Sequence, residues 1–470
     1  MILKPGLKNT CINTVISITP AVFTIICGLA VRYLFFISVD PPLCFSDTPT
    51  YMDGAFSIFH HLHMNEYRPP VYPAGLMLSG ILFNWENVGT GIIYFQIVLS
   101  AVNSFYVFKL VSLSFGNKLL AYFAAFMVTI SYKIFAWDFV ILAENFSILT
   151  VTLLTYNLIM YIKYYKKATL AIIWVLSVLA IFTKPFFLFI PFIILLIFAA
   201  SIFIYGNKVI RSHTRLAVTG FIAVYICVFA YSMVNYLQNG YFGLTTVSNV
   251  NSFGKVIQYK MENLGDNKKL IGDIKHAMEN EKDEYKVGNE FLEPWHFIYS
   301  YRWEGNHYSE VGRFSRQVIL HHPAEYAARS IKLTYELIVL DSQIRNYIAD
   351  AALTRAGHPN KTLLALRKFT DIFDRLYIFL SLCAIEMFII IIFVKRKAFN
   401  IEKQATFIIL VIILYHFLVS AFISYGDYSR LIAPCYALIY SIICLNIYRV
   451  VSYFAAVIEC IAGRILKAGN

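Results

Sequence analysis

The chain has 470 residues, of which 59% are hydrophobic and only 14% are charged, with a formal net charge of +12. Soluble domains carry about 25% charged residues, so this composition cannot coat a water-soluble body with polar surface. It excludes a disordered chain, a cytosolic enzyme and a disulfide-stapled secreted module, and we expect no nucleic-acid partner.

Apolar runs long enough to cross a bilayer recur along the whole chain. A helix needs about 20 apolar residues to span about 30 Å of hydrocarbon. Such runs predict an all-α polytopic membrane protein with a bundle of about ten (±2) transmembrane helices. The candidate spans lie near 15–37, 92–113, 119–137, 144–162, 169–183, 185–205, 216–236, 376–394, 404–423 and 431–449.

Three of these runs carry a further interpretation. The first is longer than the apolar region of a signal peptide and lacks a cleavage site of small residues, so we interpret it as a retained anchor. Lys184-Pro185 separates the fifth run from the sixth, because proline interrupts a helix. These two runs are either two short spans or a re-entrant pair. The stretch 72–84 is too short to assign.

The orientation follows from lysine and arginine, which stay on the cytoplasmic side near the ends of spans. With the N-terminus inside, 17 basic residues fall in inner segments and three in short outer segments, namely Arg68, Lys184 and Arg430. This orientation makes two outer regions large. One is a first outer loop at 38–91, and the other is a charge-mixed region at 237–375.

Three regions follow from this topology. Residues 1–236 form a transmembrane module that includes the first outer loop. Residues 237–375 form a mostly helical outer subdomain, within which 321–340 has the pattern of an interfacial amphipathic helix. Residues 376–470 form the last transmembrane helices and a cytoplasmic tail.

Charged residues gather near the outer membrane face, which predicts a charged cavity open to that side. Such residues are costly near apolar helices and are functional candidates by default. Arg32 and Lys133 either join this cavity or extend to the lipid headgroups. His60, His61 and His63 form the densest histidine cluster, but their spacing is weak evidence for a metal site. We expect no cofactor; a divalent metal is compatible with the sequence but not indicated.

Five short segments follow one another in a recognisable order. They are SDTPTYMDGA at 46–55, EYRPPVYPAGL at 66–76, LAENFSI at 142–148, FTKPFFLFIP at 182–191 and GDYSRLIAPCYALI at 426–439. Their order, side and spacing resemble those of the GT-C superfamily of membrane glycosyltransferases. The chain departs from many relatives by having no second acid directly after Asp47. This departure weakens any analogy with metal-dependent oligosaccharyltransferases.

The resemblance implies a sugar donor linked to polyprenyl phosphate and a site at the outer leaflet. An acceptor hydroxyl must lose its proton as it attacks the anomeric carbon, and we predict Asp47 as the general base. Glu144 either orients the donor sugar or helps to position Asp47; it is otherwise an ordinary helix-start carboxylate. Fixed cations are needed for the departing lipid phosphate. Arg68, Lys184 and Arg430 are the candidates.

Aromatic residues next to the motifs are candidate substrate contacts. Tyr51, Tyr72 and Tyr428 adjoin the charged residues in the sequence. Trp295 and Trp303 lie in the outer subdomain, where their rings either support an acceptor glycan or belong to an interfacial aromatic belt.

The expected function is inverting transfer of one sugar to a lipid-linked or surface glycan, such as O-antigen or lipopolysaccharide. The expected location is a bacterial inner membrane, with both termini cytoplasmic and the site facing the periplasm. The alternatives are a transporter or flippase for lipid-linked glycans, and a polymerase that uses lipid diphosphate-linked repeats. Transporters often carry polar residues on broken helices near the midplane, whereas here the charges lie at the outer face.

Overall fold

The computed structural model describes residues 5–39, 41–45, 47–203, 208–280, 307–339, 361–372, 401–426 and 428–468. Within these ranges every regular element is a helix, and the β-type pairing is limited to an isolated bridge between Leu43 and Val140. The expected all-α architecture is confirmed.

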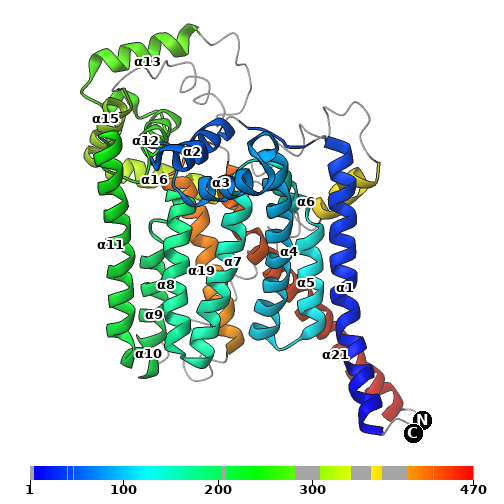
Figure 1. Cartoon of the computed structure of the whole chain (residues 1–470). Coiled ribbons are helices and arrows are strands. Elements are labelled where there is room, and N and C mark those ends of the chain that lie inside the picture. Colours follow the sequence, from blue (N-terminus) through cyan, green and yellow to red (C-terminus); the bar gives the residue numbers. More distant parts are fainter. Residues whose placement is uncertain are drawn as a thin grey trace.

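Most of the helices run side by side as a bundle (Figure 1). Seven in the described ranges are long and apolar enough to cross a membrane, and a bent pair makes an eighth. They are α1 (Pro5–Val39), α4 (Val88–Phe115), α7 (Glu144–Tyr164), α9 (Ile190–Phe203), α11 (Thr214–Asn239), α19 (Ile401–Phe422), α20 (Tyr428–Ile432) continuing into α21 (Tyr436–Ala468), and the bent pair α5 (Lys118–Ile130) with α6 (Tyr132–Phe135). The protein is thus a multi-pass membrane protein.

Nine of the ten predicted spans coincide with helices, and the run 376–394 lies outside the described residues. The run 169–183 corresponds to α8 (Lys167–Thr183), a helix of 17 residues. Lys184 then adopts an extended conformation before Pro185 starts a short 3-10 turn, after which α9 begins. α8 and α9 each run along the bundle (Figure 1), so Lys184 lies at the turn between two helices of the bundle.

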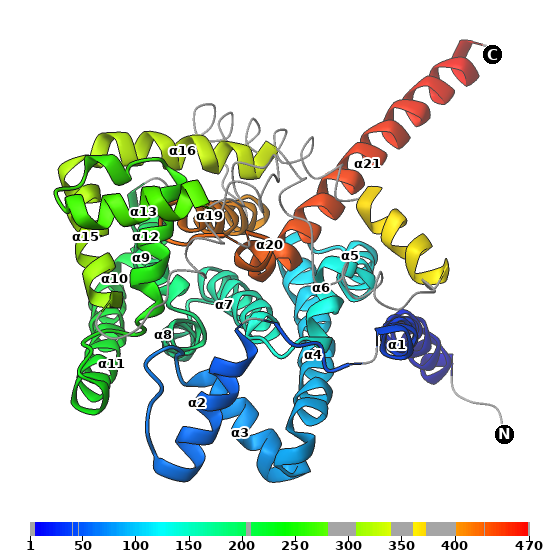
Figure 2. The ribbon, with the colours of Figure 1, turned by 90° about the horizontal axis from the view of Figure 1, so that it is seen from above.

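The first outer loop folds into two short helices. α2 (Thr48–His61) and α3 (Val71–Phe83) lie across one end of the bundle (Figure 1). Seen from above, they flank α7 and α20 on one side, and α16 (Pro323–Val339) lies on the other (Figure 2). The ambiguous stretch 72–84 is thus part of the outer layer.

The described part of the outer subdomain is helical and rests on the same end of the bundle (Figure 1). Its labelled helices are α12 (Val247–Gln258), α13 (Lys268–Asn280), α15 (His307–His321) and α16. Tyr259, directly after α12, and Tyr326 of α16 hold the end of α19. Tyr259 donates a hydrogen bond to the carbonyl of Ala421 at 2.7 Å, and Tyr326 donates one to that of Phe422.

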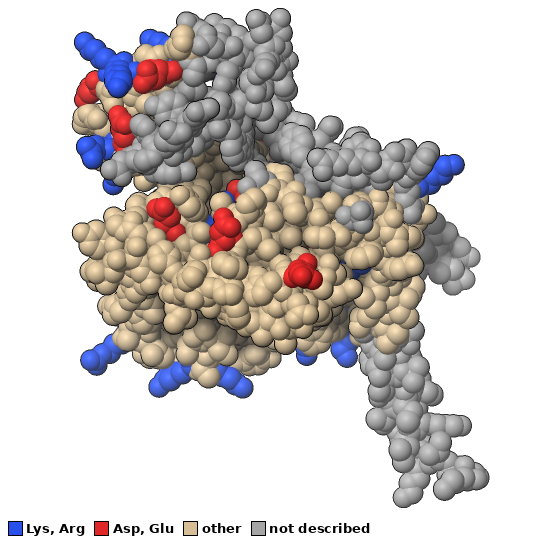
Figure 3. Space-filling view, turned by 45° about the horizontal axis from the view of Figure 1, so that its top comes forward, with Lys and Arg blue, Asp and Glu red and all other residues tan. Residues whose placement is uncertain are grey.

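Basic side chains mark the opposite end of the bundle (Figure 3). The connections from α4 to α5, from α7 to α8 and from α9 through α10 (Lys208–Ser212) to α11 lie there. Exposed lysines and arginines in these connections are Lys118, Lys166, Lys167, Lys208, Arg211 and Arg215. The basic end of the bundle therefore lies away from α2, α3 and the outer subdomain.

Arg32 has a structural role that differs from both sequence interpretations. It neither extends to the surface nor lines a charged cavity, because its Nε lies 2.7 Å from Oδ2 of the fully buried Asp138. Its Nη2 also donates to Ser100 at 2.6 Å. A buried ion pair is stable only when further hydrogen bonds satisfy both groups, and this pair joins α1 to α4 and to the bend after α6.

Candidate functional site

Five charged side chains from five separate segments meet at the end of the bundle that α2 and α3 cover. Asp47 immediately precedes α2, and Arg68 lies between α2 and α3. Glu144 is the first residue of α7, Lys184 follows α8, and Arg430 lies in α20. The tertiary structure therefore joins all five motifs at one place.

Asp47 is held between two guanidinium groups. Its Oδ1 lies 2.6 Å from Nη2 of Arg68, and its Oδ2 lies 2.9 Å from Nη2 of Arg430. Burial by itself raises the pKa of Asp47, but Arg430 and Arg68 outweigh it and hold that pKa well below its usual range. Both carboxylate oxygens are thus occupied, and the group is ionised.

Glu144 is held between two cations in the same way. Its Oε1 accepts a hydrogen bond from Nζ of Lys184 at 2.9 Å and one from Nε of Arg430 at 2.7 Å. Arg430 therefore bridges the two carboxylates. The five groups form a chain that runs from Arg68 through Asp47, Arg430 and Glu144 to Lys184.

The local fold of the loop before α2 directs Asp47 into this chain. Asp47 occupies the N-cap position of α2, but its side chain makes no capping hydrogen bond there and points to the arginines instead. The hydroxyl of Thr48 accepts a hydrogen bond from the Phe45 amide and donates one to the carbonyl of Ile141. The backbone of Leu43 pairs with Phe139 and Ile141. These bonds fix the loop against the segment that leads into α7.

Arg68 has two further contacts that set its orientation. Its Nε donates to the hydroxyl of Thr50 at 2.7 Å, and its guanidinium carbon lies 4.6 Å from the centre of the Tyr51 ring. A cation over an aromatic face gains about 0.5–2 kcal/mol, depending on solvent exposure. Burial raises the pKa of Tyr51 to about 12, so its hydroxyl stays neutral. Tyr51 and Thr50 therefore form a fixed support for Arg68.

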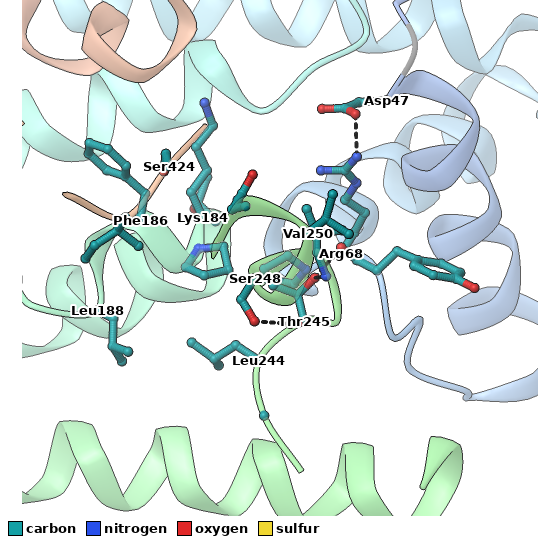
Figure 4. Close-up of a pocket in the computed structure, with 18 of the residues that line it drawn as sticks. Asp47, Arg68, Lys184, Phe186, Leu188, Leu244, Thr245, Ser248, Val250 and Ser424 are labelled. Atoms are coloured by element: carbon teal, nitrogen blue, oxygen red, sulfur yellow. Dashed lines mark hydrogen bonds and ion pairs between the residues drawn. The ribbon is translucent and has the colours of Figure 1, made fainter. Parts of the chain in front are cut away.

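A cavity of about 690 Å³ opens beside this chain of charges (Figure 4). Asp47 and Arg68 lie on one side of it and Lys184 on the other (Figure 4). Arg430 also lines it. The rest of the cavity wall has two parts. One part is apolar, and the other carries neutral hydroxyl and amide groups. The apolar part includes Phe186, Leu188, Phe189, Val228 and Leu244; the neutral polar part includes Tyr67, Tyr241, Ser248 and Asn251.

The predicted site residues differ in their access to this cavity. Asp47, Arg68, Lys184, Arg430 and Tyr51 line it. Three others are buried behind the lining, namely Glu144, Tyr72 and Tyr428. The hydroxyl of Tyr72 donates to Gln96 at 3.0 Å, and its ring packs edge-on against Tyr51. Trp295 and Trp303 lie outside the described residues.

The described residues hold no group of three or more His, Cys, Asp or Glu side chains that could hold a metal ion. The two carboxylates of the site are instead engaged by arginine and lysine. The expectation of no resident cofactor stays a prediction.

The segment that joins α11 to α12 also lines the cavity, and the sequence did not predict this. Threonine hydroxyls and a backbone amide of this segment bind the backbone carbonyls of the first outer loop. The hydroxyl of Thr245 donates to the carbonyl of Tyr67 at 2.7 Å, and the amide of Thr246 donates to that of Glu66 at 3.0 Å. No motif marks this segment, because threonine is common in loops and the acceptors are backbone carbonyls, which every residue carries.

Comparison with known proteins supports the fold. No protein-family model and no curated protein sequence matches the chain. Among solved structures it is similar to the oligosaccharyltransferase AglB from Archaeoglobus fulgidus in complex with an inhibitory peptide and a dolichol-phosphate. The TM-score is 0.50 at 13% identity, over 94% of this chain and 52% of that one. An oligosaccharyltransferase from the same organism, in complex with zinc and sulfate, gives a TM-score of 0.53 at 13% identity over 94% and 51% of the two chains.

A third structure, ArnT from Cupriavidus metallidurans in the apo state, aligns with a TM-score of 0.37 at 11% identity over 86% of this chain and 77% of that one. This chain spans about half the length of the two oligosaccharyltransferases. The chain has a GT-C-like fold, the fold of the membrane glycosyltransferases that its five motifs resemble.

Proposed function

We propose that the protein is an integral membrane glycosyltransferase that moves a single sugar from a polyprenyl-phosphate donor to an acceptor glycan or lipid. The observation that supports this most is the chain of five charges at the edge of a cavity whose wall is partly apolar. A lipid phosphate matches both features, because its anionic phosphate suits the cations and its lipid chain suits the apolar wall.

The charge of the site favours a donor with one phosphate. Three cations and two carboxylates leave one positive charge in excess among Arg68, Asp47, Arg430, Glu144 and Lys184. A sugar linked to a lipid through one phosphate is a diester with a single negative charge, which balances that excess. A lipid diphosphate brings more negative charge than the site balances. This difference favours the monophosphate donor over the polymerase alternative.

The cations also suit the departing group. As the bond between the anomeric carbon and the phosphate oxygen breaks, its electron pair stays on the phosphate, which gains negative charge. Fixed cations in a partly dry site stabilise such developing charge. Arg68, Lys184 and Arg430 line the cavity and are positioned by their own contacts. The apolar wall takes the lipid chain next to the phosphate.

Asp47 acts as the general base only after its arginines have moved. In the present arrangement both of its oxygens face guanidinium groups, and its low pKa makes it a weak base. A donor phosphate competes for Arg68 and Arg430 and frees one carboxylate oxygen. The pKa of Asp47 then rises toward its ordinary value. The carboxylate accepts the proton of the acceptor hydroxyl while the hydroxyl oxygen bonds to the anomeric carbon.

This single displacement inverts the anomeric configuration and needs no covalent intermediate. Glu144 has a positioning role, because it is fully buried behind the lining and holds Lys184 and Arg430 through one oxygen. The neutral rim at Tyr67, Tyr241, Ser248 and Asn251 suits the hydroxyl groups of an acceptor. The proposed acceptor is O-antigen, lipopolysaccharide or another surface polysaccharide.

The proposed location is a bacterial inner membrane with the site on the periplasmic side. The basic connections at the end of the bundle opposite the site support this orientation, because lysine and arginine are retained in the cytoplasm. Both termini are then cytoplasmic.

The test is sugar transfer by the purified protein in vesicles. A panel of labelled polyprenyl-phosphate hexoses and pentoses is supplied with extracted surface glycan as the acceptor. Asp47→Asn should insert and fold but transfer no sugar. The matched control is Asp53→Asn, because Asp53 is an exposed carboxylate in α2, the helix that begins directly after Asp47. Transfer by Asp47→Asn at the parental rate would exclude Asp47 as the base, and movement of the donor across the vesicle without transfer would favour a flippase.

A further inference from the structure

One fully buried lysine lies outside the chain of five charges. Lys255 belongs to helix α12 of the outer subdomain, and its side chain is 0% exposed. A lysine is rarely buried completely, because the ammonium loses its hydration. Burial lowers the pKa of Lys255 well below its ordinary value. Burying this ammonium therefore carries a desolvation cost, and the contacts of Lys255 indicate what the residue does.

The ammonium of Lys255 is directed at Tyr428. Its Nζ donates a hydrogen bond to the Tyr428 hydroxyl at 2.9 Å and another to Oε1 of Gln258 at 3.2 Å. It also lies 5.0 Å from the centre of the Tyr428 ring and 5.2 Å from that of Tyr259, within the range of cation–π attraction. One lysine thus engages both the hydroxyl and the ring of Tyr428.

Tyr428 is the first residue of α20, the five-residue helix that contains Arg430. Because Tyr428 and Arg430 belong to the same short helix, contacts that fix Tyr428 also restrain the backbone from which Arg430 projects. Arg430 is the group that bridges Asp47 and Glu144. The preceding segment is also held from the outer subdomain, through Tyr259 to Ala421 and through Tyr326 to Phe422. Helices α12 and α16 therefore hold both ends of the segment that leads to Arg430.

We infer that Lys255 is a positioning residue, which acts through Tyr428 to hold Arg430 against Asp47 and Glu144. The outer subdomain thereby sets the affinity of the site for a lipid phosphate. This inference rests on the proposed function, because it assigns Arg430 to phosphate binding. Lys255 itself touches neither the substrate nor the reacting atoms.

The test measures binding of undecaprenyl phosphate to the full-length protein in nanodiscs, together with the thermal unfolding midpoint. Lys255→Met keeps the length and apolar stem of the side chain and removes the charge. Tyr428→Phe keeps the ring and removes the hydroxyl. Lys268→Met is the matched control, because Lys268 is exposed at the start of the neighbouring helix α13. Arg430→Gln shows how much binding of undecaprenyl phosphate is lost when the arginine itself is removed.

We expect Lys255→Met to weaken binding about tenfold, which corresponds to about 1.4 kcal/mol. Its unfolding midpoint should be unchanged or higher, because a buried charge is removed. A merely structural lysine would lower the midpoint instead. Tyr428→Phe should weaken binding in the same direction, and Lys268→Met should bind as the wild type does. Adding Lys255→Met to Arg430→Gln should weaken binding no further, because the effect passes through Arg430.

Results that contradict the role of Lys255 can be told apart from results that contradict the proposed function. If Arg430→Gln weakens binding but Lys255→Met and Tyr428→Phe do not, the role of Lys255 is overturned while the proposed function stands. If Lys255→Met fails to fold, Tyr428→Phe becomes the deciding variant. Unchanged binding by Tyr428→Phe then overturns the role of Lys255 and leaves the proposed function standing. If the wild type binds no undecaprenyl phosphate, the proposed function fails and this inference fails with it.

Discussion

Replacing Glu144 with glutamine removes one negative charge from the centre of the site with little change in shape. Glu144 is 0% exposed and accepts hydrogen bonds from Lys184 and Arg430 through the same oxygen. The amide oxygen of glutamine still accepts a hydrogen bond, but it carries no charge to balance the two cations. Glu144→Gln therefore leaves two largely buried cations with less compensation.

The expected loss is large because the site is buried. Removing one partner of a buried ion pair costs about 3–5 kcal/mol, since the remaining charge is left without its counter-ion. The pair Arg329–Glu325 on α16 gives the comparison, because its side chains are 40% and 41% exposed. An exposed pair four residues apart on a helix contributes only about 0.3–0.5 kcal/mol. Glu144→Gln should thus lower the free energy of unfolding several times more than Glu325→Gln.

The assay is equilibrium unfolding of the purified variants in mixed micelles with increasing dodecyl sulfate. Adding Lys184→Met to Glu144→Gln should recover part of the loss, because one of the two uncompensated cations is removed. Coupling of this kind is typically about 0.5–3 kcal/mol for residues in contact. If Glu144→Gln costs no more than Glu325→Gln, the carboxylate does not hold the cations and the reasoning on this network is refuted.

Three further predictions concern neighbouring groups. Arg430 and Arg68 lower the pKa of Asp47 against the effect of burial, so its stabilising contribution is present above its unfolded pKa of about 3.9 and lost as the pH falls further. The stability difference between the wild type and Asp47→Asn should therefore be constant above about pH 5 and shrink below about pH 4; a difference that grew on acidification would contradict the pairing. Lys184→Ala should weaken binding of undecaprenyl phosphate about tenfold, by loss of a charge-assisted contact; unchanged affinity would remove Lys184 from the phosphate site. Asp138→Asn should destabilise the protein by about 3 kcal/mol or more in the same unfolding assay without weakening lipid phosphate binding, and a selective loss of binding would place Asp138 in the site.

Several features of the fold are predictable because they depend on local composition. A bilayer requires each span to be about 20 apolar residues and to satisfy its own backbone hydrogen bonds. The runs of Phe, Ile and Leu therefore mark the helices, and Lys184-Pro185 marks the break between α8 and α9. The amphipathic pattern at 321–340 likewise marks α16.

The membership of the candidate site was partly predictable, but the pairing of its charges was not. The five motifs name Asp47 and its charged neighbours because each motif lies at the outer end of a span. Nothing in them indicates that one arginine bridges two carboxylates, or that Glu144 lies behind the cavity lining. Arg32 shows the same limit, because its partner Asp138 belongs to another helix.

The sequence by itself thus determined the membrane-spanning helical architecture and the end of the bundle at which the charges gather, because hydrophobicity and charge act residue by residue along the chain. Only the tertiary structure decided which charges meet, which of them face the cavity, and that Lys255 of the outer subdomain reaches Tyr428. The physical reason is that an ion pair depends on distance and burial in three dimensions, and segments far apart in the chain supply its two partners.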